Sequence, residues 1–330
     1  MSTIAETITS TFSNTQIQPD FDGAPKFESL TNDSMSSGTN GSCSTFCTSK
    51  GILTITGEQR LKFLQGQTTC DTSKISKEKA SYGAFCNLKG RSIANFLAYD
   101  DGTSCHLIMH QGLITPLIDH LTKFAVFFRV TLTNNDQLLI SGQLNIPSLE
   151  LSPLLVESKD NQTHIQISPT RTLTVSSLDH FTATLITSPL CSEAVWNEKD
   201  LEEGIAWITP STSEAFLPQL LGLEEIDGLS FSKGCYTGQE IIARMKYRGQ
   251  LKRHLQLAQL TPKEGLEVNL PPGAKLNSQE KSNIGQVINL ENRSQGFLAL
   301  LSLEDDFTAI NECLIEQKPF EINIMDIKRA

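Results

Sequence analysis

The sequence predicts an α+β fold with antiparallel sheet, followed by a smaller all-β unit. Between residues 50 and 142, short strand-like runs alternate irregularly with two helix-like stretches, an order typical of α+β domains. After Gly249, short strand-like runs are separated by Pro, Gly and Asn, which predicts a barrel or sandwich of about 80 residues. The chain has 330 residues, of which 38% are hydrophobic and 19% charged, and this is sufficient for a buried core.

The first expected strand is GILTITG at residues 51–57, a branched run closed by glycine. A helix is expected next in EQRLKFLQG, because Leu61 and Leu64 recur at helical spacing. Similar patterns predict strands in ASYGAFCN, SIANFLAYD and SCHLIMH, a helix in GLITPLIDHLTKF, and strands in AVFFRVTLT and QLLISG.

The middle of the chain is less periodic. Residues 143–164 contain two prolines and are expected to form a connecting excursion. Two strands, RTLTVSS and TATLITS, should follow and lead into a helical, loop-rich region that begins near residue 189. The strands of the final all-β unit are expected in HLQLAQL, IGQVINL, GFLALLSL and FEINIMDI.

Residues 1–49 differ in composition from the rest, because 22 of these 49 positions are Ser, Thr or Asn. Such a segment has too little apolar surface to offset its ordering entropy, so we predict a disordered tail. It contains Cys43 and Cys47 in CSTFC. Two cysteines without a third ligand nearby do not define a metal site, and no metal is predicted.

The net charge of −10 excludes a protein that coats nucleic acid or an anionic membrane with its whole surface, so any such contact would be local. No run approaches the roughly 18 apolar residues of a membrane span. The N-terminus lacks the features of a secretory signal. The eight cysteines are scattered, which predicts reduced thiols and a cytoplasmic protein.

The stretch KGCYTGQEIIARMKYRGQLKR, from Lys233 to Arg253, combines glycines, a cysteine and many positive charges. Its TGQE segment has the pattern of a capping box, in which Thr237 accepts from a backbone N–H and Glu240 reaches back. We therefore expect a helix from this point, with an apolar stripe of Ile241, Ile242 and Met245, ending at Gly249.

Cys235 precedes the expected helix start, where the helix dipole and Lys233 would favour a thiolate. A functional thiol is one interpretation. A small buried residue in a strand-to-helix turn is the other, because cysteine often behaves as a compact hydrophobe.

Six Lys or Arg residues and one acid, Glu240, lie between residues 233 and 254. The candidates for anion binding are Arg244, Lys246 and Arg248, with Gly234 and Gly238 allowing close backbone approach. The anion would be a ligand carboxylate or an RNA phosphate. The alternative is a solvated helix face, which commonly carries such charges.

KGCYTGQE followed by a basic helix resembles the signature of the YgfZ family, bacterial folate-binding relatives of the glycine-cleavage aminomethyltransferase. FLQGQTTCD at 63–71, KGR at 89–91, KFAVFFRV at 123–130 and FLPQLLGLEEIDGLSFSKGCY at 216–236 extend this resemblance. The motif residues in this chain are Lys233, Gly234, Cys235, Tyr236, Gly238, Gln239 and Glu240.

The resemblance implies an aminomethyltransferase-like folate-binding fold, with two intertwined α+β subdomains and a C-terminal β-barrel around a central folate pocket. On this basis we expect a folate-binding domain over residues 50–248, with subdomains at 50–142 and 165–248. The barrel should occupy residues 249–330, after the tail of residues 1–49.

The resemblance also assigns Trp196 and Glu202 to the site of tetrahydrofolate or a derivative. An indole offers a flat face for stacking, and a carboxylate can accept paired N–H bonds from a pterin. Without the family, a core tryptophan and a solvated glutamate are the simpler interpretations. Lys50 stands where some relatives have an aromatic residue, so folate affinity or orientation should differ.

Aminomethyltransferases carry an aspartate in the region where this chain has Ala94 and Asn95. Neither residue can handle the proton and iminium charge of one-carbon transfer. The leading hypothesis is therefore not an active aminomethyltransferase. It is a folate-binding accessory or regulatory protein that supports assembly or repair of iron–sulfur enzymes, including tRNA-thiolating ones, with the Cys235 thiol near the folate. A folate-dependent one-carbon transferase and an RNA-docking protein are the alternatives.

Overall fold

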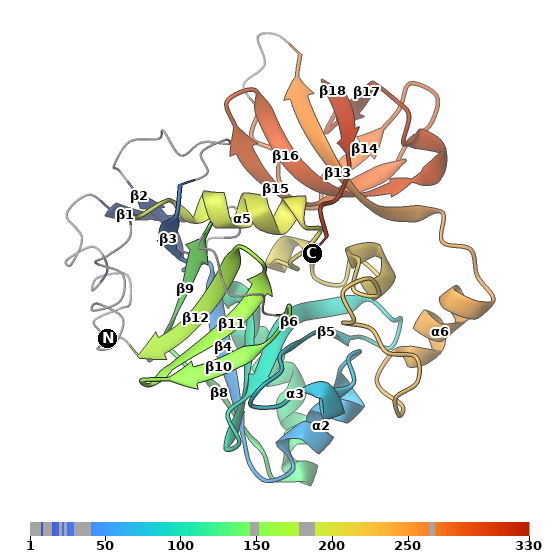
Figure 1. The fold of residues 1–330 in the computed structure, drawn as a ribbon. Helices are drawn as coiled ribbons and strands as arrows, with labels where there is room; N and C mark the ends of the chain where they lie inside the picture. Colours follow the sequence, from blue (N-terminus) through green and yellow to red (C-terminus); the bar gives the residue numbers. More distant parts are fainter. Residues whose placement is uncertain are drawn as a thin grey trace.

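The molecule contains two five-stranded antiparallel sheets and a closed six-stranded barrel (Figure 1). The computed structural model describes Ile8 and residues 15–19, 22, 25–29, 41–145, 152–177, 189–263 and 268–329. The predicted α+β domain and the C-terminal barrel are confirmed.

The first sheet has the order β5-β6-β7-β4-β8. Its strands are β4 (Lys50–Thr56), β5 (Ser81–Cys86), β6 (Ser92–Asp100), β7 (Ser104–His110) and β8 (Thr131–Asn134). Helices α2 (Arg60–Gln67) and α3 (Ile114–Phe128) accompany this sheet, and short 3₁₀ helices lie at Thr72–Lys74 and Gln111–Leu113. The predicted strands of this region are therefore present, with one exception.

The exception is AVFFRVTLT, which was predicted as one strand. Its first four residues complete α3, and β8 begins only at Thr131. The reason is the buried stripe of α3, in which Leu117, Leu121 and Ala125 follow each other at four-residue intervals. Arg129 then ends the helix in the left-handed region, with φ of 51°.

The second sheet has the order β10-β11-β12-β9-β3. Its strands are β3 (Cys43–Phe46), β9 (Leu138–Leu144), β10 (Val156–Lys159), β11 (Gln162–Ser168) and β12 (Arg171–Ser177). The predicted excursion over residues 143–164 is wrong where the structure describes it, because β10 and part of β11 lie there. The strand predicted in TATLITS lies outside the described residues.

The prediction of a disordered tail is also wrong for the described part of residues 1–49. Strand β1 (Thr15–Pro19) pairs with β2 (Pro25–Ser29), and β3 is an edge strand of the second sheet, paired with β9. Phe27 and Phe46 are fully buried with ring centroids 4.7 Å apart. A few well-placed apolar residues therefore order a segment whose average composition is polar.

A disulfide joins Cys43 of β3 to Cys191, with the two Cα atoms 6.0 Å apart. The expectation that the thiols remain reduced is therefore wrong for this pair. The two residues are separated by 148 positions in sequence, so their proximity follows from the placement of β3 in the second sheet.

The barrel has the closed order β13-β16-β15-β14-β17-β18. Its strands are β13 (Arg253–Pro262), β14 (Lys275–Asn277), β15 (Gly285–Arg293), β16 (Gly296–Glu304), β17 (Glu312–Ile315) and β18 (Lys318–Met325), with a 3₁₀ turn at Asp305–Phe307. Its interior is filled by its own cluster of buried side chains, including Leu260, Val287 and Phe320.

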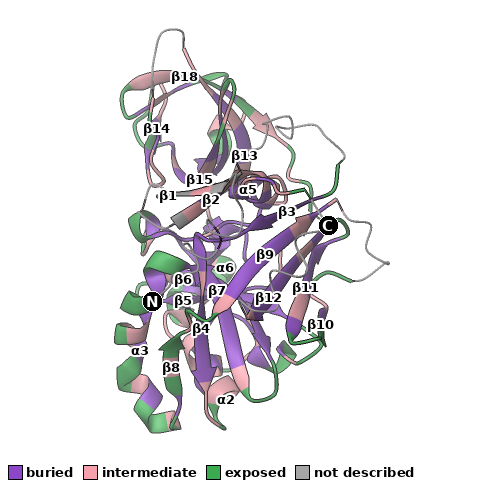
Figure 2. Ribbon diagram, turned by 90° about the vertical axis from the view of Figure 1, so that its left-hand side faces the viewer, coloured by how far each residue is buried: buried purple, intermediate pink, exposed green. Residues whose placement is uncertain are grey.

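Helix α5 (Glu193–Glu202) lies between the barrel and the second sheet (Figure 1). The chain continues through 3₁₀ helices at Pro210–Thr212 and Pro218–Leu221 to α6 (Gln239–Tyr247), which lies at the edge of the molecule in this view. Figure 2 shows that burial is continuous across the central strands, whereas much of α3 is exposed.

None of the helices in the described ranges combines the length and the hydrophobicity that a membrane crossing requires.

The packing of α5 against β9 can be tested at Gly142, with Gly66 of α2 as the control. A Cβ atom on Gly142 of β9 would overlap the ring of Trp196, whereas a Cβ on Gly66 of α2 would meet nothing within 4 Å. Gly142→Ala should lower the free energy of unfolding by about 1–3 kcal/mol through overpacking. Gly66→Ala should raise it by up to about 1 kcal/mol, because it restricts the unfolded chain and favours helix. Urea unfolding of both variants measures this; equal effects would contradict the described packing.

Candidate functional site

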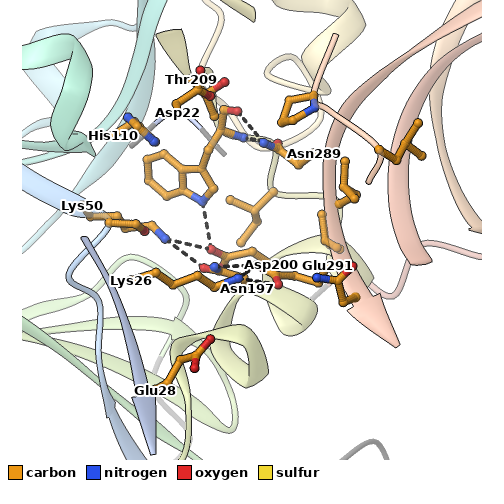
Figure 3. A pocket seen from close by; sticks show the side chains of 18 of the residues that line it. Asp22, Lys26, Glu28, Lys50, His110, Asn197, Asp200, Thr209, Asn289 and Glu291 are labelled. Atoms are coloured by element: carbon orange, nitrogen blue, oxygen red, sulfur yellow. Dashed lines mark hydrogen bonds and ion pairs between the residues drawn. The ribbon is translucent and has the colours of Figure 1, made fainter. Parts of the chain in front are cut away.

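A cavity of about 390 Å³ lies where the first sheet, α5 and the barrel meet. Its walls come from β2, β4, α5, residues 205–209 and β15. Figure 3 shows Lys26, Lys50, Asn197, Asp200 and Glu291 gathered on one side, with His110, Asp22, Thr209 and Asn289 on another. Its described polar lining includes the acids Asp22, Glu28, Asp200 and Glu291, the lysines Lys26 and Lys50, and the asparagines Asn197, Asn269, Asn289 and Asn292.

Trp207 lines this cavity and is carried by a short extended segment. Two asparagine side chains hold the segment from opposite sides. Asn95 of β6 donates to Ala206 O at 2.6 Å and accepts from Ile208 N at 2.7 Å. Asn289 of β15 donates to Trp207 O at 2.8 Å and accepts from Trp207 N at 2.7 Å. The segment is thus fixed to the first sheet and to the barrel, as a strand would be.

The indole of Trp207 is oriented by Asp200 of α5. Its Nε1 donates to Asp200 Oδ2 at 2.8 Å, and Arg171 Nη1 lies 2.8 Å from Asp200 Oδ1. Lys50 Nζ lies 3.7 Å from Asp200 Oδ2 and 5.0 Å from the Trp207 ring centroid. One buried carboxylate therefore links the second sheet, α5 and two residues of the cavity wall.

Electrostatics keep the two cations of this cluster charged. Burial acts against the charged form of both Lys50 and Arg171, but the neighbouring acids, Asp200 first among them, raise the pKa of each side chain above its usual value. A charged Lys50 is the consequence of placing a lysine beside a buried carboxylate.

The barrel contributes a second acidic position through Glu291, which is 6% exposed. Its carboxylate accepts from Asn197 Nδ2 at 2.8 Å and pairs with Lys26 Nζ at 2.6 Å. On another side of the cavity, Asp22 accepts from the backbone N and the hydroxyl of Ser211. The described parts of the N-terminal segment therefore contribute to the cavity wall.

The two residues predicted to bind a folate do not line this cavity. Trp196 is 1% exposed, and its ring packs beneath the Arg171 guanidinium at 4.6 Å and against Gly142. Glu202 forms ion pairs with Lys199 at 3.0 Å, Arg293 at 3.4 Å and Lys328 at 3.6 Å. Both belong to α5, but they face the core and the barrel strand β15 rather than the cavity.

The capping-box prediction is wrong. Helix α6 begins at Gln239, its N-cap is Gly238 with φ of 83°, and no side chain caps it. A Cβ on residue 238 would lie 2.5 Å from Asn87 O and 2.9 Å from Gly90 Cα, so only glycine permits this approach to the 87–91 turn. This close contact, rather than a capping threonine, determines where the helix begins.

Lys233 points into the molecule. Its Nζ donates to Gln65 O and Thr68 O, both at 2.6 Å, at the C-terminal end of α2, and lies 4.7 Å from the Tyr236 ring centroid. Burial lowers the pKa of Lys233 to about 8. Gly234, Cys235 and Glu240 are exposed, and Gln239 Oε1 accepts from Tyr236 N. None of these motif residues lines the cavity, so the expectation that Cys235 lies beside a folate there does not hold.

The eight cysteines fall into three groups. Cys43 and Cys191 form the disulfide, and Cys235 is the exposed one of the remaining six. Burial raises the pKa of Cys86 and Cys313 to about 12, and it also raises the pKa of the other buried thiols, Cys47, Cys70 and Cys105. Among the described residues, no three His, Cys, Asp or Glu side chains are arranged to hold a metal ion.

The three predicted anion-binding residues all lie on α6 or at its end. Arg244 and Arg248 are exposed, and neither forms an ion pair with a described residue. Lys246 pairs with Glu224 and lies 5.6 Å from the Phe231 ring centroid. Lys246 is thus neutralised, whereas the two arginines are open to solvent.

No family model matches the chain. Among solved structures, it is similar to the glycine cleavage system aminomethyltransferase T from Bartonella henselae, with a TM-score of 0.67 and 12% identity over 87% of this chain and 86% of that one. Two sheets, a barrel and a central cavity therefore define a protein of aminomethyltransferase-like fold.

Sequence comparison is more specific. The chain is 33% identical over 244 residues to the tRNA-modifying protein YgfZ of Escherichia coli O139:H28, covering 67% of this chain and 74% of that protein. It is 33% identical over 215 residues to the protein of that name from Vibrio vulnificus YJ016, where the match spans 66% of the relative's length. The chain belongs to the YgfZ family.

The burial of Lys233 predicts a pH dependence. Its pKa is about 8 in the folded protein and about 10.4 when unfolded, so the unfolded chain binds more protons between these values. Raising the pH through this window should therefore increase the free energy of unfolding of the native protein relative to Lys233→Met. Denaturant unfolding of both proteins from pH 7.5 to about 10 provides the measurement. A constant difference between the two would contradict a lowered pKa at this half-buried lysine.

Proposed function

We propose that this chain is a folate-binding accessory protein that supports assembly or repair of iron–sulfur enzymes in the cytoplasm, including enzymes that modify tRNA. The observation that carries the proposal is the central cavity. The cavity lies within a fold similar to that of an aminomethyltransferase, and its volume of about 390 Å³ is that of a small-molecule site. The printed name of the relatives supports the connection with tRNA modification.

The residues of the cavity fit a tetrahydrofolate. Trp207 supplies an indole for contact with a flat ring system, and the wall carboxylates offer acceptors for the N–H groups of a pterin. Lys26 and Lys50 are paired with Glu291 and Asp200, so they offer ammonium N–H donors rather than an excess of positive charge to the carboxylates of a glutamate tail. The proposed folate residues are therefore Trp207, Asp200, Glu291, Lys26 and Lys50. Trp196 supports the site indirectly, by packing beneath the Arg171 that pairs with Asp200.

A one-carbon transferase is less well supported. Ala94 has no ionisable group, and the side chain of Asn95 is buried, donates to Ala206 O and accepts from Ile208 N. An asparagine in this position holds the cavity wall and leaves no group for proton transfer. We therefore propose binding without aminomethyl transfer.

Cys235 is the proposed functional thiol. It is the exposed free cysteine, and it follows Gly234, where a Cβ would meet nothing within 4 Å, so a partner can reach it. Stable iron–sulfur clusters take four protein ligands, so Cys235 would act with a partner protein rather than hold a cluster alone. Its separation from the cavity means that folate and thiol would act at different surfaces.

The folate assignment predicts different effects for the two tryptophans. Trp207→Ala should weaken tetrahydrofolate binding by at least about tenfold, because a stacking surface in the cavity is lost. Trp196→Phe should retain binding and lower stability instead, because that ring is in the core. Calorimetric titration with tetrahydrofolate, run beside urea unfolding, gives both quantities. Weak binding in Trp196→Phe with native affinity in Trp207→Ala would reverse the assignment.

The thiol assignment predicts that Cys235→Ser loses support of iron–sulfur enzymes while it keeps the fold and folate affinity. Because Cys235 is exposed, the substitution should change the free energy of unfolding by less than about 0.5 kcal/mol. Activity of iron–sulfur enzymes in cells that carry only the variant is the measurement. Cys313→Ser, which alters a buried thiol of the barrel, is the control. Undiminished enzyme activity in Cys235→Ser would remove the role.

A further inference from the structure

We propose that α6 and the 87–91 turn form a docking surface for single-stranded RNA, independent of the folate cavity. The surface, called the α6 face below, consists of Leu88, Lys89, Arg244, Tyr247 and Arg248. All five residues are exposed.

The α6 face is held rigidly by the body of the protein. Ile242 is fully buried beneath the helix, and Gln219 Nε2 donates to Ile242 O at 2.9 Å. The glycines of the two segments allow them to touch, because Gly238 approaches the turn and Gly90 lies against Ile241 and Ile242. The turn that carries Leu88 and Lys89 therefore lies against the N-terminal half of α6, and both side chains are exposed beside the helix.

The charges of the α6 face favour an anion. Lys89, Arg244 and Arg248 form no ion pair with any described residue, whereas Lys246 is neutralised by Glu224. Arg244 and Arg248 are four residues apart and so lie on the same side of the helix. Glu240, one turn earlier, is the acid of α6. The excess of free cations is local, since the whole chain carries a charge of −10.

The exposed Tyr247 of the α6 face favours a nucleic acid over other anionic partners. Tyr247 is 69% exposed, although its ring is supported edge-on by Phe231 at 5.8 Å between centroids. Leu88, at 84% exposed, adds an apolar surface next to the helix. An exposed, oriented aromatic ring among cations is the combination with which proteins bind single-stranded nucleic acid, where bases stack while phosphates pair with Arg or Lys. An acidic protein partner would use the cations and leave the ring without a role.

Fluorescence anisotropy with a labelled, unstructured RNA of about 12 nucleotides tests the proposal. Binding should weaken with salt, with a log–log slope of about −2 if three phosphates are contacted. Arg244→Glu/Arg248→Glu should lower affinity at least tenfold and flatten the slope by about 1.4. Tyr247→Ala should lower affinity about fivefold or more without changing the slope, and Tyr247→Phe should restore it.

Lys159→Glu/Lys275→Glu is the matched control, because it changes the net charge equally at two exposed lysines on β10 and β14. Native RNA affinity in this control supports the α6 face. Equal loss in the control, no salt-sensitive RNA binding, or equally tight binding of polyglutamate or anionic vesicles would overturn the proposal. Tetrahydrofolate titration of the same variants separates the two sites: unchanged folate affinity with absent RNA binding would remove this inference alone.

Discussion

The arrangement of the cavity depends on one buried carboxylate, that of Asp200. It accepts from Arg171 of the second sheet and from the indole of Trp207, and it lies beside Lys50 of the first sheet. Removal of one member of such a buried ionic group typically costs about 3–5 kcal/mol, because the partner charges remain uncompensated. The Asp200 carboxylate thus fixes the two sheets and α5 relative to one another, and it also orients the cavity wall. Lys50 is explained by this cluster, because Arg171 also pairs with Glu203 and the two acids together balance two cations.

Strand β6 connects the cavity with the surface that carries the thiol. At its centre Asn95 holds residues 206–208, and at its start the 87–91 turn contacts Gly238 and α6. Arg91 and Ser92 also bind the backbone of residues 214–216. The motif stretches 63–71, 89–91 and 233–240 therefore meet in one assembly, with Lys233 bonded to the end of α2. In this cluster of motif segments Cys235 is exposed to solvent, and none of the residues 233–240 lines the cavity.

Local pattern was sufficient to predict most strands, and the strand predicted in RTLTVSS coincides with β12. Local pattern failed where contacts between residues remote in sequence determine the structure. Strand β3 is ordered because it pairs with β9 and because Phe27 and Phe46 pack together in the core. The average composition of residues 1–49 does not reveal these contacts. Trp207 was missed because it sits in a short irregular segment between Gly204 and Pro210, held by asparagines that are remote in sequence. Trp196 was chosen by family position, although its helical spacing with buried Asp200 and Leu201 indicates a packed face of α5.

We propose that a folate binds beside Trp207 in the cavity built around Asp200. The chain has two tryptophans, so magnetic resonance of isotope-labelled indole nitrogens gives two signals, which Trp196→Phe assigns. Titration with tetrahydrofolate should shift the Trp207 indole signal to saturation, since its Nε1 donates to Asp200 at the cavity wall, and should leave that of Trp196 nearly unchanged. A saturable shift of Trp196 alone, or no shift of Trp207 at saturating folate, would contradict a folate site beside Trp207.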